Sequence, residues 1–353
     1  MNVDWSMSVL NIKYLIKLAC SAVAAFVILN IVCFFYYNVP VHSESKTNST
    51  DYIWEADKFY SKGTEGFAFG KTDSNGFNNL STEYSISPEI LVMGSSHTEG
   101  FNVSQEENYV SLLNSFAMSN GNDFRAYNIG VSGHTAAICF NNLENAVDEF
   151  KPSKYVVIEV NSVDLSMDDI ENISAGTVKK IHSSANPILI FLQKIPFVRC
   201  VYYQLDKMDF DVKKDDNKNE NVSSENETDS DSAYEYAVNE LLYNMKAIAQ
   251  ENGIRLIIML NTSLNIDEGG NVVPYKFSSE EKAFVSACHR NGIDFIDMRD
   301  EFSKKYCETN KLPHGFSNTA IGVGHLNKYG HETIAYVLYE HISALEKNNL
   351  IGA

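Results

Sequence analysis

The stretch that decides the fold is EILVMGSSHTEG, residues 89–100, in which an apolar run ends abruptly in small and polar residues. The run at 90–94 has the length and composition of a buried β-strand. The residues after it, from Gly94 to Gly100, have little to offer a hydrophobic core. Because ligands of parallel α/β sheets bind beyond the carboxyl ends of the strands, this cluster predicts a functional site.

Short apolar runs alternate with segments of helical spacing along the rest of the chain. Further short apolar runs occur at 125–129, 155–160, 255–260 and 294–297. Segments with helical spacing separate them, at 109–117, 136–150, 233–250 and 279–290. Strands that are apolar throughout and alternate with helices are typical of a parallel sheet covered on both faces. We therefore predict a three-layer α/β/α domain whose parallel sheet has about five strands.

The composition excludes one large class of function. The chain has 353 residues, 44% of them hydrophobic, which is enough for a substantial core. Its formal net charge is −18 and no cluster of Lys and Arg stands out. Because nucleic-acid binding depends on clustered basic side chains at the phosphates, we expect no nucleic-acid partner.

A membrane anchor is predicted at 18–37, which has no charged residue over a length of about 30 Å in a helix. Lys13 and Lys17 precede this segment, so the positive-inside rule places residues 1–17 in the cytoplasm and the rest outside. A cleaved signal peptide is the alternative. We favour the anchor because the apolar stretch exceeds the usual signal length and no small-x-small cleavage site follows it.

Two further segments are expected to carry little structure. Residues 38–86 are rich in Gly, Asn and Ser, and we interpret them as a tether and irregular lead-in to a domain spanning 87–348. The acidic segment 213–232 has too few apolar residues to offset its ordering entropy, so it is predicted to be a disordered insertion. Four cysteines lie outside the anchor and permit three disulfide pairings, which stay open: Cys139, Cys200, Cys288 and Cys307.

Polar blocks follow the predicted strands, and they occur in a recognisable order. The first is GSSHTEG, at 94–100, and the second is NIGVSGHT, at 128–135. The third is EVNSVD, at 159–164, and the last is GHLNKYGH, at 324–331. Together they resemble the blocks of the SGNH (GDSL-like) hydrolase family, over about residues 88–345. The resemblance implies a flavodoxin-like sheet and a serine esterase or acyltransferase.

The resemblance also implies roles for individual residues. Ser96 stands at the nucleophile position and His325 at the general-base position. The oxyanion of the tetrahedral intermediate would be held by the backbone amides of Ser96 and Gly133, with the side-chain amide of Asn161 as the third donor. His97 and His134 lie beside the expected cleft, where they would contact substrate or, as we favour, support the site through hydrogen bonds. No cofactor or metal is expected, because the histidines lack ligand spacing.

Two departures from the family pattern affect these assignments. The family's acid, three residues before the histidine, is replaced by Gly322. His325 would then be oriented by a backbone carbonyl or by an acid from another loop. An ungapped alignment also puts Val163, rather than Asn161, at the family's asparagine position.

Three functional hypotheses follow from the resemblance. The favoured one is a single-pass membrane protein whose outward-facing domain is an esterase or O-acyltransferase for acyl, mainly acetyl, groups of cell-surface carbohydrate. Related proteins work beside a membrane-bound O-acyltransferase, which is therefore an expected partner. The alternatives are a lipid esterase or lysophospholipase, and a catalytically inactive carbohydrate-binding protein of the same fold.

Overall fold

A computed structural model describes residues 5–44, 52–122, 124–178, 187–205 and 227–351. In these residues the largest sheet has five parallel strands in the order β10-β9-β8-β6-β7. Counted along the chain, this is the flavodoxin-like order 2-1-3-4-5, which confirms the predicted fold class. The strands are β6 (Ile90–Met93), β7 (Ala126–Asn128), β8 (Tyr155–Val160), β9 (Arg255–Leu260) and β10 (Asp294–Asp297).

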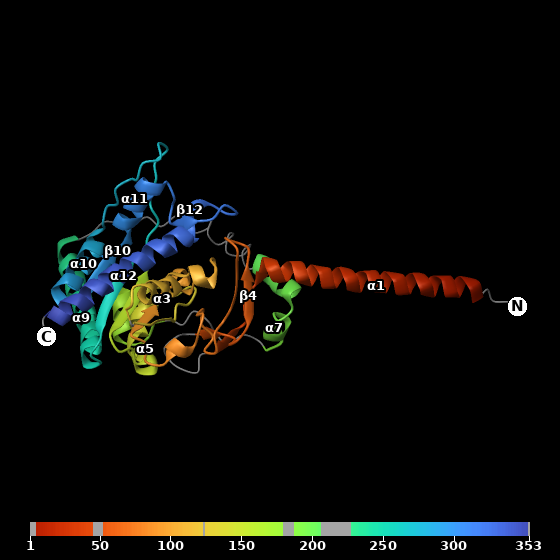
Figure 1. Cartoon of the computed structure of the whole chain (residues 1–353), viewed down its shortest axis with the longest axis horizontal. Coiled ribbons are helices and arrows are strands. Elements are labelled where there is room, and N and C mark those ends of the chain that lie inside the picture. Colours follow the sequence, from red (N-terminus) through yellow and green to blue (C-terminus); the bar gives the residue numbers. More distant parts are fainter. Residues whose placement is uncertain (1–4, 45–51, 123, 179–186, 206–226, 352–353) are drawn as a thin grey trace.

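Helices cover both faces of this sheet (Figure 1). Successive strand residues point to opposite cores: Leu91 lies in one hydrophobic cluster and Val92 in the other. The first cluster includes residues of α4 (Ala136–Asn141), α5 (Leu143–Phe150), α6 (Met167–Ser174), α9 (Glu227–Glu251) and α10 (Ser279–Asn291). The second includes residues of α3 (Tyr109–Ser119), α11 (Met298–Thr309) and α12 (Lys328–Ile351).

Two helical segments differ from the sequence prediction. The single helix expected at 136–150 is interrupted at Asn142, which separates α4 from α5. Residues 213–226 of the predicted acidic insertion, which spans 213–232, lie outside the described residues. Its last residues, 227–232, form the start of α9, so the prediction of disorder is wrong there.

The segment 38–86 is not an irregular tether. It contains β1 (Tyr37–Asn38), β2 (His42–Glu44), β3 (Tyr52–Trp54), β4 (Phe59–Lys62) and β5 (Ala68–Lys71), followed by the short helix η1 (Glu83–Ser85). Strands β1, β4 and β5 form an antiparallel sheet. The prediction failed because scattered aromatic residues, such as Tyr60 and Phe77, are buried in the main core despite their polar surroundings.

The predicted anchor lies in α1 (Trp5–Tyr36), which extends away from the α/β domain in Figure 1. Among the described residues, one helix is long and apolar enough to cross a membrane, and it is the part of α1 from Ile12 to Tyr36. Only 6% of its most apolar window is buried by the rest of the protein. The remaining short elements are α2 (Ser96–Glu99), η2 (Gln105–Glu107), α7 (Pro187–Leu192), β11 (His314–Gly315) and β12 (Ile321–Leu326).

Candidate active site

The two neighbouring serines after β6 have different roles. Ser95 is buried and caps α2, because its hydroxyl accepts a hydrogen bond from the His97 amide at 3.2 Å. The same hydroxyl donates to the Glu159 carboxylate at 2.9 Å. Ser96, the first residue of the helix, is half-buried at the surface of the turn. The turn therefore fixes Ser95 in the fold and presents the hydroxyl of Ser96.

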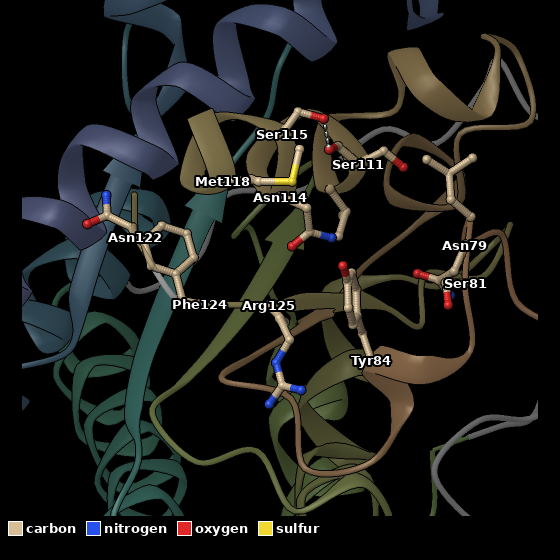
Figure 2. A pocket seen from close by; sticks show the side chains of 12 residues that line it. Asn79, Ser81, Tyr84, Ser111, Asn114, Ser115, Met118, Asn122, Phe124 and Arg125 are labelled. Carbon is tan, nitrogen blue, oxygen red and sulfur yellow. Dashed lines mark hydrogen bonds between the residues drawn. The ribbon is translucent and has the colours of Figure 1, made fainter. Parts of the chain in front are cut away.

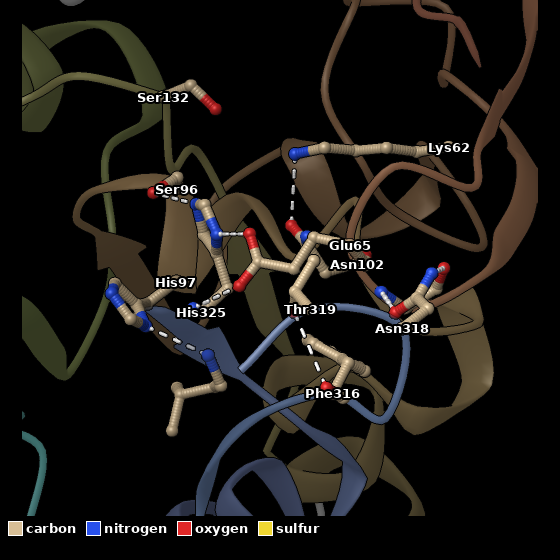
Figure 3. Close-up of polar contacts among 12 residues, drawn as sticks. Lys62, Glu65, Ser96, His97, Asn102, Ser132, Phe316, Asn318, Thr319 and His325 are labelled. Carbon is tan, nitrogen blue, oxygen red and sulfur yellow. Dashed lines mark hydrogen bonds and ion pairs between the residues drawn. The ribbon is translucent and has the colours of Figure 1, made fainter. Parts of the chain in front are cut away.

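The structure brings Ser96 and His325 together from positions 229 residues apart. Strand β12 carries His325 and pairs with β11 in an antiparallel ribbon. Nε2 of His325 lies 2.9 Å from Oγ of Ser96, within hydrogen-bonding distance (Figure 3). The imidazole is thus placed where it can accept the hydroxyl proton.

Glu65 occupies the far side of the imidazole. Its Oε2 lies 2.5 Å from Nδ1 of His325, and its Oε1 accepts a hydrogen bond from the His325 backbone N–H at 2.8 Å. Figure 3 shows the ring between the hydroxyl of Ser96 and this carboxylate. An acid from another loop was one of the two groups expected to orient His325, but Glu65 was not identified, because it lies in the segment interpreted as a lead-in. No local signal marks it beyond the flanking Gly63 and Gly66.

The loop that carries Glu65 is held from two sides. The Asn318 side chain accepts from the Gly66 N–H at 2.8 Å and donates to the carbonyls of Gly63 and Gly66 at 3.1 and 2.9 Å. Asn102 donates to the carbonyl of Glu65 at 3.0 Å. Because the backbone on both sides of Glu65 is bonded, the carboxylate is held in place before any substrate arrives.

The environment of Glu65 favours its charged form. Burial opposes ionisation, but the hydrogen bonds and charge of His325, with a smaller contribution from Lys62, outweigh it and lower the pKa of the carboxyl. Lys62 donates a hydrogen bond to Oδ1 of Asn102 at 3.1 Å, and burial lowers the pKa of its ammonium group. An ionised carboxylate beside Nδ1 holds the imidazole with its proton on that nitrogen, leaving Nε2 free to act as base.

The end of α1 is hydrogen-bonded to the segment that leads to this carboxylate. Tyr37 and Asn38, which follow α1, pair with the last two residues of β4. The carbonyl of Tyr36 also accepts a hydrogen bond from the Gly63 N–H at 2.8 Å. Glu65 lies two residues after Gly63, so the end of α1 and the acid belong to one hydrogen-bonded structure.

The second polar block forms a loop that is anchored by a buried acid. Ser132, next to Gly133, donates through its hydroxyl and through its N–H to the carboxylate of Glu99. Glu99 also accepts from the indole N–H of Trp54 at 2.6 Å, and burial raises the pKa of this carboxyl. Gly133 itself is exposed, with φ +86°, a left-handed conformation that favours glycine.

Asn161, not Val163, lies at the surface beside the serines. Asn161 follows β8 directly, and its side-chain amide lies 3.2 Å from the Ser95 hydroxyl. Val163, at the position that the ungapped alignment favoured, is fully buried in the main core.

The neighbouring histidines are built into the fold. Nδ1 of His97 accepts from the Leu326 N–H at 3.2 Å, and burial lowers the pKa of His97 to about 4. The His134 ring is buried in the loop before α4, and its backbone N–H donates to Val131. His314 contacts Asn261 at 3.1 Å. In the part of the chain that the structure describes, no group of three or more His, Cys, Asp and Glu side chains is arranged to hold a metal ion.

A separate cavity of about 330 Å³ lies between α3 and the segment 79–84 (Figure 2). None of the residues that line it belongs to the predicted site. Its polar groups are largely engaged within the fold: Asn114 exchanges two hydrogen bonds with the backbone of Ala126, and Arg125 is paired with Glu89. We assign no function to this cavity.

Comparison with solved structures finds distant similarity to several ester-cleaving enzymes. The esterase EstA from Pseudoalteromonas sp. is 13% identical, with a TM-score of 0.39 over 73% of this chain and 98% of that one. The acetyl xylan esterase AlAXEase is 13% identical, with a TM-score of 0.40 over 72% and 99%. The lipase/acylhydrolase from Enterococcus faecalis is 16% identical, with a TM-score of 0.38 over 72% and 95%. No protein-family model matches the chain, and no curated protein does.

Proposed function

We propose that the chain is a membrane-anchored serine esterase or O-acyltransferase that acts on acyl groups, mainly acetyl, of cell-surface carbohydrate. The observation that carries this proposal is the continuous contact from the Ser96 hydroxyl through His325 to the Glu65 carboxylate. This serine, imidazole and carboxylate sequence is how serine hydrolases activate a hydroxyl for attack on an ester. The carboxylate of Glu65 also supports an active enzyme over the inactive-protein hypothesis, which follows from the missing acid at position 322 and the shifted asparagine.

The mechanism follows from the contacts of His325. As the Ser96 oxygen attacks the ester carbonyl, its proton moves to Nε2, and the imidazolium that forms is stabilised by the carboxylate of Glu65 at Nδ1. The same proton is then given to the departing alcohol. An acyl group remains on Ser96, and its transfer to water or to a sugar hydroxyl, with His325 again as base, restores the enzyme.

Three donors are proposed for the negative oxygen of the intermediate. They are the backbone N–H groups of Ser96 and Gly133 and the side-chain NH₂ of Asn161. In support, the backbone N–H groups of Ser96 and Gly133 are not consumed by hydrogen bonds among the described residues. The Asn161 side chain is exposed after β8 and lies 3.2 Å from the hydroxyl of Ser95, the neighbour of Ser96. Loss of one such donor typically reduces the rate about a hundredfold to a thousandfold.

Membrane anchoring supports the choice of a cell-surface substrate. Lys13 and Lys17 lie in the N-terminal half of α1, before its uncharged stretch, so we place the N-terminus in the cytoplasm and the α/β domain outside the cell membrane. An anchored enzyme in that position meets acylated polymers at the surface. If the acyl group is transferred to a sugar hydroxyl and not to water, the partner that we propose is a membrane-bound O-acyltransferase.

A lipid ester is the second candidate substrate, and one observation favours it. Ile321 and Val323, on the strand that leads to His325, are 70% and 66% exposed. Apolar side chains beside a catalytic histidine suit a long acyl chain better than an acetyl group. Comparing acetyl with octanoyl and palmitoyl esters separates the candidates, because preference for the acetyl ester supports the carbohydrate substrate.

The test of the proposal is hydrolysis of a chromogenic acetyl ester by the full-length protein in detergent micelles. The full chain is required because β1 follows the anchor without a break. Ser96→Ala and His325→Ala should each lower kcat by at least roughly a thousandfold. Ser286→Ala and His289→Ala, on the exposed face of α10, are the matched controls and should leave the rate unchanged. Equal activity of Ser96→Ala and the unmodified protein would refute the proposal.

A further inference from the structure

A helical stretch at 196–205 lies along the outer end of the membrane helix. The ring of Phe197 meets that of Phe26 edge-on, at 6.3 Å between centroids, and its N–H donates to the Asn30 side chain at 3.2 Å. Further along, Tyr203 stacks on Tyr37 with 4.1 Å between centroids. Both helices advance in the same direction through these contacts, so they pack in parallel.

Cys33 and Cys200 lie midway between these two sets of contacts. Both side chains are buried, with 8% and 9% exposure, and both are thiols in the structure. The two side chains are near enough for the Cys33 thiol to contribute to the raised pKa of the Cys200 thiol. The contacts of Phe197 and Tyr203 fix the position of the stretch 196–205 against α1 on both sides of the two cysteines. The packing of the two helices, and not the rotation of one side chain, therefore brings the two sulfur atoms near each other.

We propose that Cys33 and Cys200 form a disulfide bond that ties the membrane helix to the α/β domain. The proposal rests on the outward orientation given under the proposed function, because disulfides persist in oxidising compartments. Each thiol loses one hydrogen as the sulfur–sulfur bond forms. The two protons and two electrons pass to a thiol–disulfide oxidoreductase of the extracytoplasmic space, whose own disulfide is reduced to a dithiol.

A disulfide requires two Cα atoms within about 7 Å of each other and side chains that point toward one another. The bond would join positions separated by 167 residues (200 − 33), a long loop whose closure restricts the unfolded chain considerably. Burial raises the pKa of the Cys200 thiol to about 11, so little thiolate is present once the helices have packed.

The sequence alone did not suggest this pair. Cys33 falls within the apolar span, and the four outer cysteines were considered only with one another. Because Cys33 lies one turn before the end of α1, it is close enough to the surface to meet Cys200 of the outer domain. The bond would brace the junction from which β1 leads to β4 and then to Glu65.

The test uses the full-length protein in native membranes. The protein in these membranes is denatured in the presence of a maleimide, which blocks free thiols. One sample is treated without reductant and one after reduction, and the digested protein of each is examined by mass spectrometry. We expect Cys33 and Cys200 to stay unblocked until reductant is added and to appear in one cross-linked peptide pair. In Cys33→Ser, Cys200 should react without reductant. Cys307→Ser, a change at an exposed thiol of α11, is the matched control and should leave the pair intact.

Free Cys33 and Cys200 before reduction, or a peptide that joins either one to another cysteine, would overturn the proposal. Its failure is distinguishable from failure of the proposed function. Labelling of Cys307 by a membrane-impermeant maleimide in intact cells reports the side of the membrane, and ester hydrolysis reports the chemistry. If these two measurements agree with an outward-facing esterase but Cys33 and Cys200 are free thiols, the disulfide proposal alone has failed.

Discussion

Oε2 of Glu65 lies 2.5 Å from Nδ1 of His325, although 260 positions separate the two residues. A second bond, from the His325 N–H to Oε1 of Glu65, fixes the carboxylate against both the ring and the backbone of β12. The acid therefore comes from the loop between β4 and β5 of the small antiparallel sheet, and the nucleophile and base come from the α/β domain. The site is complete only when the two parts are packed together.

Glu65→Gln is expected to lower kcat by roughly a hundredfold to ten-thousandfold. The neutral amide removes the charge that stabilises the imidazolium and favours the wrong tautomer of His325. Steady-state hydrolysis of an acetyl ester measures the effect, with Glu83→Gln, at an exposed position of η1, as the matched control. A Glu65→Gln rate within about twofold of the control would mean that the carboxylate has no catalytic role.

Gly324→Ala should inactivate the site with little change elsewhere. Gly324 has φ +97°, and a Cβ at this position would collide with Oε1 of Glu65. Gly121→Ala is the matched control, because Gly121 also has positive φ, +71°, but has nothing within 4 Å of a Cβ. We expect both variants to lose a similar amount of stability in thermal unfolding and only Gly324→Ala to lose activity, by at least roughly tenfold. Equal activity of the two would contradict the positioning role of Glu65.

Asn161→Ala tests the side-chain donor of the proposed oxyanion hole. We expect kcat to fall about a hundredfold to a thousandfold with little change in KM, because the interaction forms only in the transition state. Ser162→Ala, at the next exposed position, should have no comparable effect on kcat. If Asn161→Ala acts only through KM, the amide binds substrate and the third donor must be sought elsewhere.

Acid should destabilise the fold through two buried histidines, His314 and His331. Burial lowers the pKa of each to about 3, well below the ordinary value of about 6.5. Since the unfolded chain takes up these protons first, the stabilisation is complete above pH 6.5 and is lost as the pH falls toward 3. Each histidine contributes a slope of about 1.4 kcal/mol per pH unit within that range.

Denaturant unfolding of the full-length protein at pH 7.5 and pH 5 measures this dependence. His331→Gln should show a shallower loss of stability between the two pH values than the unmodified protein. His289→Gln, at an exposed position of α10, should retain the full pH dependence. Identical stability at both pH values would show that the histidines are not buried in the neutral form.

The sheet was predictable because each of its strands is a continuous apolar run, and the structure places strands at all five predicted positions. Ser96 and His325 were found because each lies where a strand or ribbon ends in a characteristic block. Glu65 was not predicted, because its partner His325 is 260 positions away and the residues around Glu65 form no recognisable sequence pattern. Its segment was taken for a tether, since the few buried aromatic residues are outnumbered by polar ones.

The choice between Asn161 and Val163 could not be made from spacing. The two positions are two residues apart, so an extended backbone would point both side chains to the same side, and only the bend of the chain after β8 decides which residue faces the cleft. The break between α4 and α5 was equally hidden. Asn142 interrupts the helix, although the apolar spacing on both of its sides is helical.

The central claim is that Ser96 is a nucleophile activated by His325. Its most direct test is reaction of the folded full-length protein with a fluorophosphonate, followed by mass spectrometry of the digested protein. We expect one adduct, on Ser96 and not on the neighbouring Ser95, with labelling strongly reduced in His325→Ala. An intact protein that takes up no label, or takes it up equally with and without His325, would contradict the claim.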